Sequence, residues 1–535
     1  MKKVLSIGLL LLSGVVSFAQ VFSFPQNTIK STKSYLIANY DTKDTAYLKE
    51  KCRQAGLDMG LSVLANRIPT DSKWVTPVPS YHLLKQGVSE LQLPMDDSQT
   101  VFAVRHSDIF DQPANINVLQ IGDELITYRT TERTGNINLF YGCHRGAFGT
   151  KKAAHSKNAT VYKLWDTPER TFLPDYELQD EMAQAESKKL AKTDFPLLIF
   201  NDLKSYAYNG QGDTAIVRLL DTMHKYNPDK LLQADLLTPN SKRYLSRINE
   251  NQLWNASMRT KIVETLTEKQ EFYRENQMPW MIGNFQIHLA DKNRNATTME
   301  ELEWFLSKAA AFDAGFGLDF SAETMRKHGL TDEMLNTINQ WETLRLAHAF
   351  NEKQKEQFKD PYGNWHLMLV DDTTFWLFEQ QISRQYVCET TLSRCDTCKY
   401  WGSVHGNWNW NSHYNSPLTF ILKVEGKGSV SNPCLISAQG RITFPGTIKA
   451  GQYLIFDLKH RGNACISDAN YNTIKEIKPM GDLPRLLEGD NLISFDCPFK
   501  GDGKQMPEVS MRFIAISEQQ PEIIFLKPTQ QPSVP

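Results

Sequence analysis

Short apolar runs alternate with amphipathic helical stretches between residues 174 and 349. Runs such as "LLIF", "LLQA", "WMIG" and "GFGL" have the length of buried strands, and each is followed by a longer stretch with helical spacing. Apolar runs that alternate with helices predict a parallel sheet with both faces covered. With one or two similar units near "SYLIANY" and "LSVLAN", the repetition predicts an α/β fold, a (β/α)8 TIM-like barrel. A doubly wound open sheet is the alternative, although the glycine fingerprint that often accompanies it is missing.

Short alternating strands separated by Gly, Asn and Asp replace this pattern in two other parts of the chain. The first part predicts a small antiparallel β-module inserted in the barrel, and the second predicts a C-terminal β-sandwich. The expected order is a signal peptide at 1–19, a TIM-like barrel at 20–349 with the β-module at 91–165, β-strands and a Cys/Trp-rich connector at 350–415, the β-sandwich at 416–527 and a disordered tail at 528–535.

The first residues have the three parts of a secretory signal peptide. Lys2 and Lys3 precede the apolar run "VLSIGLLLLSGVV", and small residues follow it up to Ala19. The run is too short to cross a bilayer, and no later segment approaches about 18 uninterrupted apolar residues. We expect an exported protein, periplasmic or secreted, that has no membrane span.

The composition narrows the class of partner. The formal net charge is -2, and nothing in the sequence suggests the basic face that a nucleic-acid partner would need. Aromatic residues make up 11% of the chain, including 11 Trp, and flat rings suit sugars, although most such rings belong to protein cores. We expect an oligo- or polysaccharide partner, no cofactor and no metal ion, and the oligomeric state is left open.

Polar side chains follow the apolar runs, at the strand ends where barrel enzymes carry their active residues. Asp202 and Asp235 end two consecutive runs, and Asp319 ends a later one. Two carboxylates are the minimum for hydrolysing a glycosidic bond, because one protonates the leaving oxygen while the other attacks or activates water. The structural alternative is that these Asp residues cap the helices that follow.

Text on both sides of these residues resembles a known group of proteins. "TFLPDYELQDEMAQ", "LLIFNDLKSY", "LLQADL", "MPWMIGNFQI" and "EELEWFLSKAAAFDAGFGLDFS" resemble secreted bacterial proteins with glycoside-hydrolase-like TIM barrels, a poorly characterised group. The likeness spans about 91 to 349 and continues into "SPLTFILKV". It implies glycan processing outside the cytoplasm. Arg247 and Asn284 match recurring positions, and with Gln286 and Tyr206 they are expected to bind the substrate.

One departure from the group's pattern puts catalysis in question. The group is expected to have Phe-Asp-Gly-x-Glu at the strand end where this chain has "NDLKS". Asp202 matches the Asp, but Leu203 stands in place of the Gly and Ser205 in place of the Glu. The chain would then be a weak enzyme, use Asp235 instead, or bind glycan without cleaving it. A polysaccharide lyase is a weaker alternative.

The β-module also contains a segment that looks like a site. "YGCHRGAFGTKKAAHSKNATVYKL" resembles text that recurs in bacterial and phage extracellular proteins, where the Arg-Gly to His segment is mostly a structural turn. We expect the same structural role for His144, Arg145 and His155.

The stretch "CDTCKYWGSVHGNWNWNSHYN" looks at first like a metal site. Cys395 and Cys398 form one pair, but His405 and His413 are too far apart for the usual zinc spacing. In an exported protein we expect Cys388, Cys395 and Cys398 to form disulfides in a loop-like connector. Its three tryptophans are expected to seal the contact between barrel and sandwich, or else to offer a sugar platform: Trp401, Trp408 and Trp410.

Overall fold

The computed structural model describes most of the chain and divides it into two compact units. The described residues are 33–39, 44–63, 66–112, 114–204, 206, 210–250, 253–254, 258–371, 374–396, 399–457, 462–482, 485–502, 505–518 and 520–523. One unit draws on residues 61–250, and the other on residues 26–60 and 251–535. The predicted signal peptide and the predicted tail lie outside the described residues. No helix in the described part of the chain is long and apolar enough to cross a membrane.

A parallel sheet of eight strands forms the barrel and confirms the predicted fold class. In chain order its strands are β1 (Tyr35–Asn39), β2 (Asp58–Val63), β10 (Leu197–Phe200), β11 (Leu231–Ala234), β12 (Arg247–Ile248), β13 (Leu253–Trp254), β14 (Met281–Gln286) and β15 (Gly315–Asp319). The order in the sheet is β12-β11-β10-β2-β1-β15-β14-β13. Strands that are adjacent in the sheet are therefore consecutive among the barrel strands, and β15 pairs with β1, as in a TIM barrel.

Helices follow most of these strands. They are α2 (Thr45–Ala55), α3 (Tyr176–Leu190), α5 (Gly212–Tyr226), α6 (Arg259–Asn276), α7 (Met299–Ala311), α8 (Ala322–Lys327), α9 (Thr331–Leu346) and α10 (Glu352–Phe358). Side-chain caps set several of their starts. Asp175 accepts from two N–H groups of α3, and Thr298 with Glu301 forms a capping box on α7. Between β11 and β12 the described residues contain turns and no helix.

The inserted β-module lies in the first unit and contains two small antiparallel sheets. One has the order β3-β9-β5-β6 and the other β4-β8-β7. The strands are β3 (Lys85–Glu90), β4 (Phe102–Arg105), β5 (Val118–Ile121), β6 (Glu124–Thr127), β7 (Thr130–Thr134), β8 (Ile137–Tyr141) and β9 (Thr160–Leu164). Rings of Phe102, Phe110 and Tyr128 pack on Phe140 in its core.

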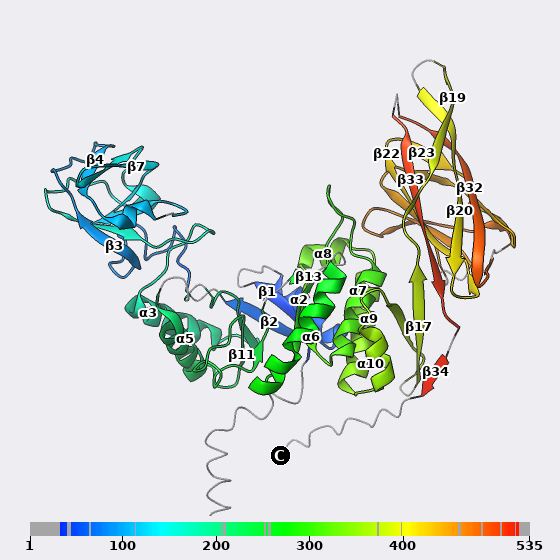
Figure 1. Ribbon diagram of the computed structural model, residues 1–535, viewed down its shortest axis with the longest axis horizontal. Helices are drawn as coiled ribbons and strands as arrows, with labels where there is room; N and C mark the ends of the chain where they lie inside the picture. The colour runs from blue at the N-terminus through cyan, green and yellow to red at the C-terminus, as the bar shows by residue number, and fades with distance from the viewer. Residues whose placement is uncertain are drawn as a thin grey trace, which may run out of the picture. The chain divides into compact units, whose positions relative to one another are not determined.

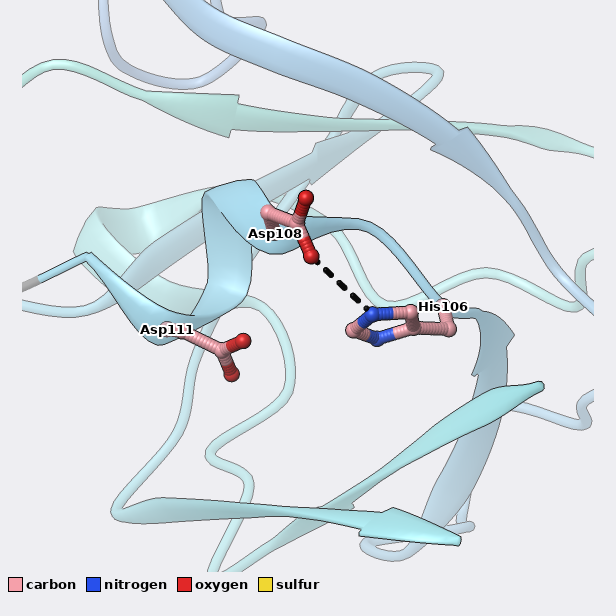
Figure 2. Close-up of side chains that lie close together, drawn as sticks. All are labelled: His106, Asp108 and Asp111. Atoms are coloured by element: carbon pink, nitrogen blue, oxygen red, sulfur yellow. Dashed lines mark hydrogen bonds and ion pairs between the residues drawn. The ribbon is translucent and has the colours of Figure 1, made fainter. Parts of the chain in front are cut away.

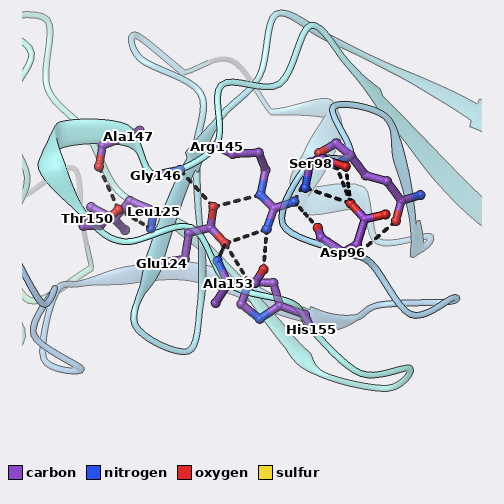
Figure 3. A network of polar contacts seen from close by, with 11 residues as sticks. Asp96, Ser98, Glu124, Leu125, Arg145, Gly146, Ala147, Thr150, Ala153 and His155 are labelled. Atoms are coloured by element: carbon purple, nitrogen blue, oxygen red, sulfur yellow. Dashed lines mark hydrogen bonds and ion pairs between the residues drawn. The ribbon is translucent and has the colours of Figure 1, made fainter.

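A buried ion network holds the turn around Arg145 for which the sequence predicts a structural role (Figure 3). Arg145 donates from Nε and Nη2 to both carboxylate oxygens of Glu124, at 2.8 and 2.7 Å. It also donates to the carbonyl oxygens of Asp96, Gln99 and Ala153. Glu124 further contacts His155 Nε2 at 2.8 Å. These contacts confirm the structural role of Arg145 and His155, because the partners of both side chains in these bonds belong to the β-module itself.

The C-terminal β-strands of the second unit form two large antiparallel sheets. The β22 sheet contains β16 (Asn364–Leu369), β17 (Thr374–Ile382), β18 (Tyr386–Val387), β22 (Thr419–Gly426), β27 (Gln452–Phe456), β28 (Ala464–Ser467), β29 (Thr473–Ile477), β33 (Pro507–Ile516) and β34 (Gln520–Ile523). The β20 sheet contains β19 (Glu389–Asp396), β20 (Lys399–Ser412), β23 (Ser429–Ser431), β24 (Cys434–Ser437), β25 (Gly440–Thr443), β26 (Thr447–Lys449), β30 (Met480–Gly481) and β32 (Gly489–Lys500). Buried residues of both sheets share one apolar core, and β21 (Ser416–Pro417) pairs separately with β31 (Arg485–Leu486).

The prediction of a loop at the Cys/Trp-rich stretch is wrong. β19 and β20 form an antiparallel hairpin, and β20 pairs with β32 along its length, as the long adjacent arrows in Figure 1 show. The alternation in "NWNWN" is the two-residue period of a strand, with amides outward and indoles inward. Trp408 and Trp410 therefore belong to the sandwich and stack on Phe495 and Phe513 instead of sealing a contact with the barrel or forming a sugar platform.

The disulfide prediction is wrong for Cys388. This residue is a buried free thiol in the sandwich core, where its N–H donates to Val509 O at 2.9 Å in the strand pairing. The side chains of Cys395 and Cys398 lie outside the described residues. The other cysteines that the structure describes are also free and buried: Cys52, Cys143, Cys434, Cys465 and Cys497.

Candidate functional site

Asp202 and Asp235 lie at the carboxyl ends of two hydrogen-bonded strands of the first unit. β10 and β11 pair in register from Leu197 with Leu231 to Phe200 with Ala234, so their ends are level. The Asp235 N–H donates to Phe200 O at 3.1 Å, and the Leu203 N–H donates to Asp235 Oδ1 at 3.1 Å. The carboxylate of Asp235 therefore sits directly against the backbone that carries Asp202.

Both carboxyl groups are deeply buried and hold protons more tightly than usual. Each residue is 5% exposed. Burial raises the pKa of Asp202 to about 7; the Arg67 charge opposes this rise and the Asp235 charge adds to it. Burial raises the pKa of Asp235 to about 6, against the lowering effects of the Leu203 N–H and the Lys204 charge. Near neutral pH, Asp202 thus keeps its proton more readily than Asp235 does.

Arg67 is the cation beside this pair, and it is not among the site residues predicted from the sequence. Its Nε lies 3.2 Å from Asp202 Oδ2, and its Nη1 lies 2.6 Å from Glu169 Oε2. Asn66 is fully buried and donates from Nδ2 to Asp202 O at 3.4 Å. Both residues follow β2, so the strand-end rule applied to Asp202 would have found them if it had been applied to "LSVLANR".

Tyr206 and Arg247, which we predicted to bind substrate, are also buried in the first unit. Tyr206 is 0% exposed, and burial with the nearby Asp202 charge raises its pKa well above the usual range. Arg247 is the first residue of β12, opposite Gln233 of β11, and is 3% exposed. Ser205, which replaces the expected Glu, lies outside the described residues.

The remaining predicted residues belong to the second unit, on the adjacent strands β14 and β15. Asn284 is buried against Gly317, where a Cβ atom would lie 2.1 Å from its Oδ1. Gln286 and Asp319 are opposite each other in the register, and Gln286 Nε2 donates to Asp319 Oδ2 at 3.2 Å. Arg294 Nη1 donates to Gln286 Oε1 at 2.9 Å, which fixes the orientation of the amide. The structure therefore pairs Asp202 with Asp235, and Asp319 with Gln286.

One group of described side chains could offer several ligands to a metal ion. His106, Asp108 and Asp111 place ligand atoms within 4.8 Å of one another in the β-module, and Figure 2 shows the His106 ring facing Asp108. His106 Nδ1 contacts Asn138 Oδ1 at 2.8 Å, and Nε2 contacts Asp108 Oδ1 at 3.2 Å. Both aspartates are exposed, and three donors are fewer than the four of a structural zinc site.

Comparison with known proteins gives only distant likenesses. No family model matches the chain, and no curated protein matches it. Among solved structures, the chain is similar to an isomaltodextranase of Arthrobacter globiformis T6 complexed with panose, at 9% identity and a TM-score of 0.22 over 65% of this chain and 74% of that one. An α-amylase of Anoxybacillus matches at 6% identity and a TM-score of 0.30 over 90% and 89%. A debranching enzyme of Nostoc punctiforme matches at 9% identity and a TM-score of 0.27 over 74% and 80%.

Proposed function

We propose that this protein processes glycans outside the cytoplasm and hydrolyses a glycosidic bond of an oligo- or polysaccharide. The observation that carries the proposal is the pair Asp202 and Asp235. These carboxyl groups end adjacent barrel strands, and burial raises the pKa of one to about 7 and of the other to about 6. A glycosidase needs one carboxyl group that is protonated and one that is ionised at the same pH.

The difference in pKa supports one division of roles between the two carboxyl groups. Asp202 is the proton donor: its proton moves to the glycosidic oxygen as the bond from that oxygen to the anomeric carbon breaks. Asp235 is the carboxylate that attacks the anomeric carbon or takes a proton from the attacking water. Arg67, 3.2 Å from Asp202 Oδ2, stabilises the carboxylate that Asp202 becomes. Asp319 is the alternative second carboxylate, and the proposed substrate-binding residues remain those predicted from the sequence: Arg247, Asn284, Gln286 and Tyr206.

The pH dependence of activity tests these roles. We expect kcat/KM to rise as the pH increases through about 6, where Asp235 ionises, and to fall through about 7, where Asp202 loses its proton. Arg67→Met removes the cation that lowers the pKa of Asp202, so the alkaline limb should move up by about one pH unit or more. Arg67→Lys keeps the charge and should leave that limb close to its original place. The pH profiles are measured by reducing-end release. An alkaline limb that shifts by the same amount in Arg67→Met and Arg67→Lys would contradict the assignment of Asp202 as the proton donor.

A non-catalytic glycan-binding protein is the second candidate. The burial of both carboxyl groups, each 5% exposed, favours it, as does Leu203 at the expected glycine position. Screening the purified protein against a polysaccharide panel separates the two, with reducing-end release measured beside retardation in affinity gels. If the protein binds a glycan but releases no reducing ends from any glycan of the panel, the proposal of hydrolysis fails and the proposal of a non-catalytic binding protein stands.

A further inference from the structure

A polar crevice in the second unit lies beside the predicted residues Gln286 and Asp319. Its volume is about 550 Å³, within the range of about 300–1,000 Å³ that is usual for ligand sites. One wall is the loop that follows β14, residues 290–295, and the other includes Lys423 and Glu425 of β22 and Tyr453 of β27. We call it the loop–sheet crevice. A smaller cavity of about 130 Å³ shares Asn295, Lys423 and Tyr453 with it.

Internal hydrogen bonds shape the loop wall. Asp291 Oδ1 accepts from the N–H groups of Asn293 and Arg294, at 2.8 and 3.1 Å, and its Oδ2 accepts from Arg294 Nε at 2.9 Å. The Ala290 N–H donates to Asn470 Oδ1 at 2.9 Å, which ties the loop to the turn after β28. The wall is therefore held in one shape before any ligand arrives, which lowers the ordering cost of binding.

Four of the five charged side chains that line the crevice form two ion pairs, and Lys292 is the fifth. Arg294 pairs with Asp291 at 2.9 Å, and Lys423 pairs with Glu425 at 2.5 Å while donating to Asn295 Oδ1 at 2.7 Å. Paired charges and amides offer many hydrogen-bond donors and acceptors with little net charge. Tyr453 is 4% exposed, so the wall also lacks a large apolar face at that position. This chemistry suits a neutral, hydroxyl-rich ligand better than an ion or an apolar molecule.

Arg294 connects the crevice with the barrel strands. Arg294 lines the crevice and donates from Nη1 to Gln286 Oε1, while Gln286 Nε2 donates to Asp319 Oδ2. A ligand that rearranges Arg294 would therefore act on the last residues of β14 and β15 through two hydrogen bonds. The same contacts place Gln286 and Asp319 at the edge of a polar ligand site.

We propose that the loop–sheet crevice binds neutral sugar residues of an oligosaccharide, through Lys292, Asn293 and the paired groups of its walls. The substrate class rests on the proposed function, but the binding itself does not require hydrolysis. An oligosaccharide should bind the crevice more tightly than a monosaccharide does, because each added sugar residue makes further hydrogen bonds to the walls.

Calorimetry on the full chain tests this inference, with maltohexaose, cellohexaose, xylohexaose and mannohexaose as probes beside the matching monosaccharides. The double variant Lys292→Ala, Asn293→Ala removes two exposed crevice side chains. It should weaken hexasaccharide binding about tenfold or more. The matched control Asn407→Ala, Lys500→Ala removes the same groups from the outward face of the β20 sheet and should leave hexasaccharide binding unchanged.

A second variant tests the crevice in case the two alanine substitutions change the affinity too little to measure. Ala469→Trp introduces an indole at a crevice residue in the turn after β28, and it should weaken hexasaccharide binding at least as strongly. Equal affinity of the crevice variants and the wild type, or no hexasaccharide binding by the wild type, would overturn the inference. Hexasaccharide binding that survives while no probe is ever cleaved would overturn the proposed hydrolysis and leave the crevice standing.

Discussion

Replacing Asp202 by asparagine should lower kcat by about 10²- to 10⁴-fold on the glycan that the protein cleaves, because the side chain can no longer donate a proton. Asn has nearly the same shape and keeps the hydrogen bond to Arg67 Nε possible, since its amide oxygen can still accept. Reducing-end release under saturating substrate measures the loss. Asp180→Asn is the matched control, because Asp180 is a partly exposed carboxylate of the same barrel that pairs with Arg218.

The same substitution should leave stability intact or improve it at alkaline pH. Asp202 has its pKa raised from 3.8 to about 7 by folding. An acid with a raised pKa lowers the free energy of unfolding progressively as the pH rises from about 4 to about 7, by up to about 4 kcal/mol in total. Asn cannot ionise, so Tm at pH of about 8 should rise, with little change at pH of about 4.

These two readouts together separate catalysis from structure. A helix-capping or otherwise structural Asp202 would lower Tm when replaced, by the cost of an ordinary lost hydrogen bond or more. Full activity of Asp202→Asn would remove Asp202 from the mechanism and leave Asp235 with Asp319 to be tested. Lost activity with raised alkaline Tm is the outcome expected of a buried acid kept for its chemistry.

Arg145→Met should destabilise the β-module by about 3–5 kcal/mol, the second large effect. The substitution leaves Glu124 buried without its bidentate partner, although Glu124 is 0% exposed. It also leaves the carbonyl oxygens of Asp96 and Ala153 without a donor that the structure provides. Hydrogen exchange followed on peptides of residues 85–164 measures the effect within the module. Arg133→Met, at an exposed arginine of β7, is the matched control and should change the exchange little.

Acid should produce a related effect in the unmodified protein. Burial alone would raise the pKa of Glu124, but hydrogen bonds from His155, Arg145 and the N–H groups of Gly146 and Ala153 outweigh it and lower the pKa to about 2. A carboxylate with a lowered pKa contributes stability that is complete above about pH 4.5 and is lost as the pH falls towards about 2. The contribution is about 3 kcal/mol. A double variant Glu124→Leu, Arg145→Met should lose this acid sensitivity, and its retention would assign it to other groups.

The barrel could be predicted because its strands are buried on both faces. All four residues of β10 are buried, and such runs stand out in a sequence whatever lies around them. The neighbourhood of Asp202 and Asp235 followed from the same logic, since consecutive strands of a barrel pair and their ends meet at one rim. Arg67 was missed because the β-module inserted after it hides the end of β2 as a strand end in the sequence.

The Cys/Trp-rich stretch shows where secondary-structure prediction from residue types alone fails. Its Gly, Asn and Ser residues are typical of loops, while its two-residue alternation of Asn and Trp indicates a strand. The stretch forms a strand, as the alternation indicates: Trp410 is 6% exposed in the sandwich core, and Asn407 faces outward. The cysteine prediction failed for a related reason. Export predicts that nearby thiols pair, but the tertiary structure buries Cys388 in the sandwich core as a free thiol.

The sequence by itself determined the architecture and which carboxylates end adjacent strands, because both depend on periodicities that are short compared with a strand or a helix. Only the tertiary structure decided that Asp202 and Asp235 are nearly inaccessible, that Arg67 stands beside them and that their pKa values rise to about 7 and about 6. Burial and charge at a site are sums over neighbours from distant parts of the chain, and Arg67 reaches Asp202 across 135 residues of sequence. A local sequence pattern does not show which distant residues surround a carboxyl group, so the burial and the pKa values of the site follow only from the tertiary structure.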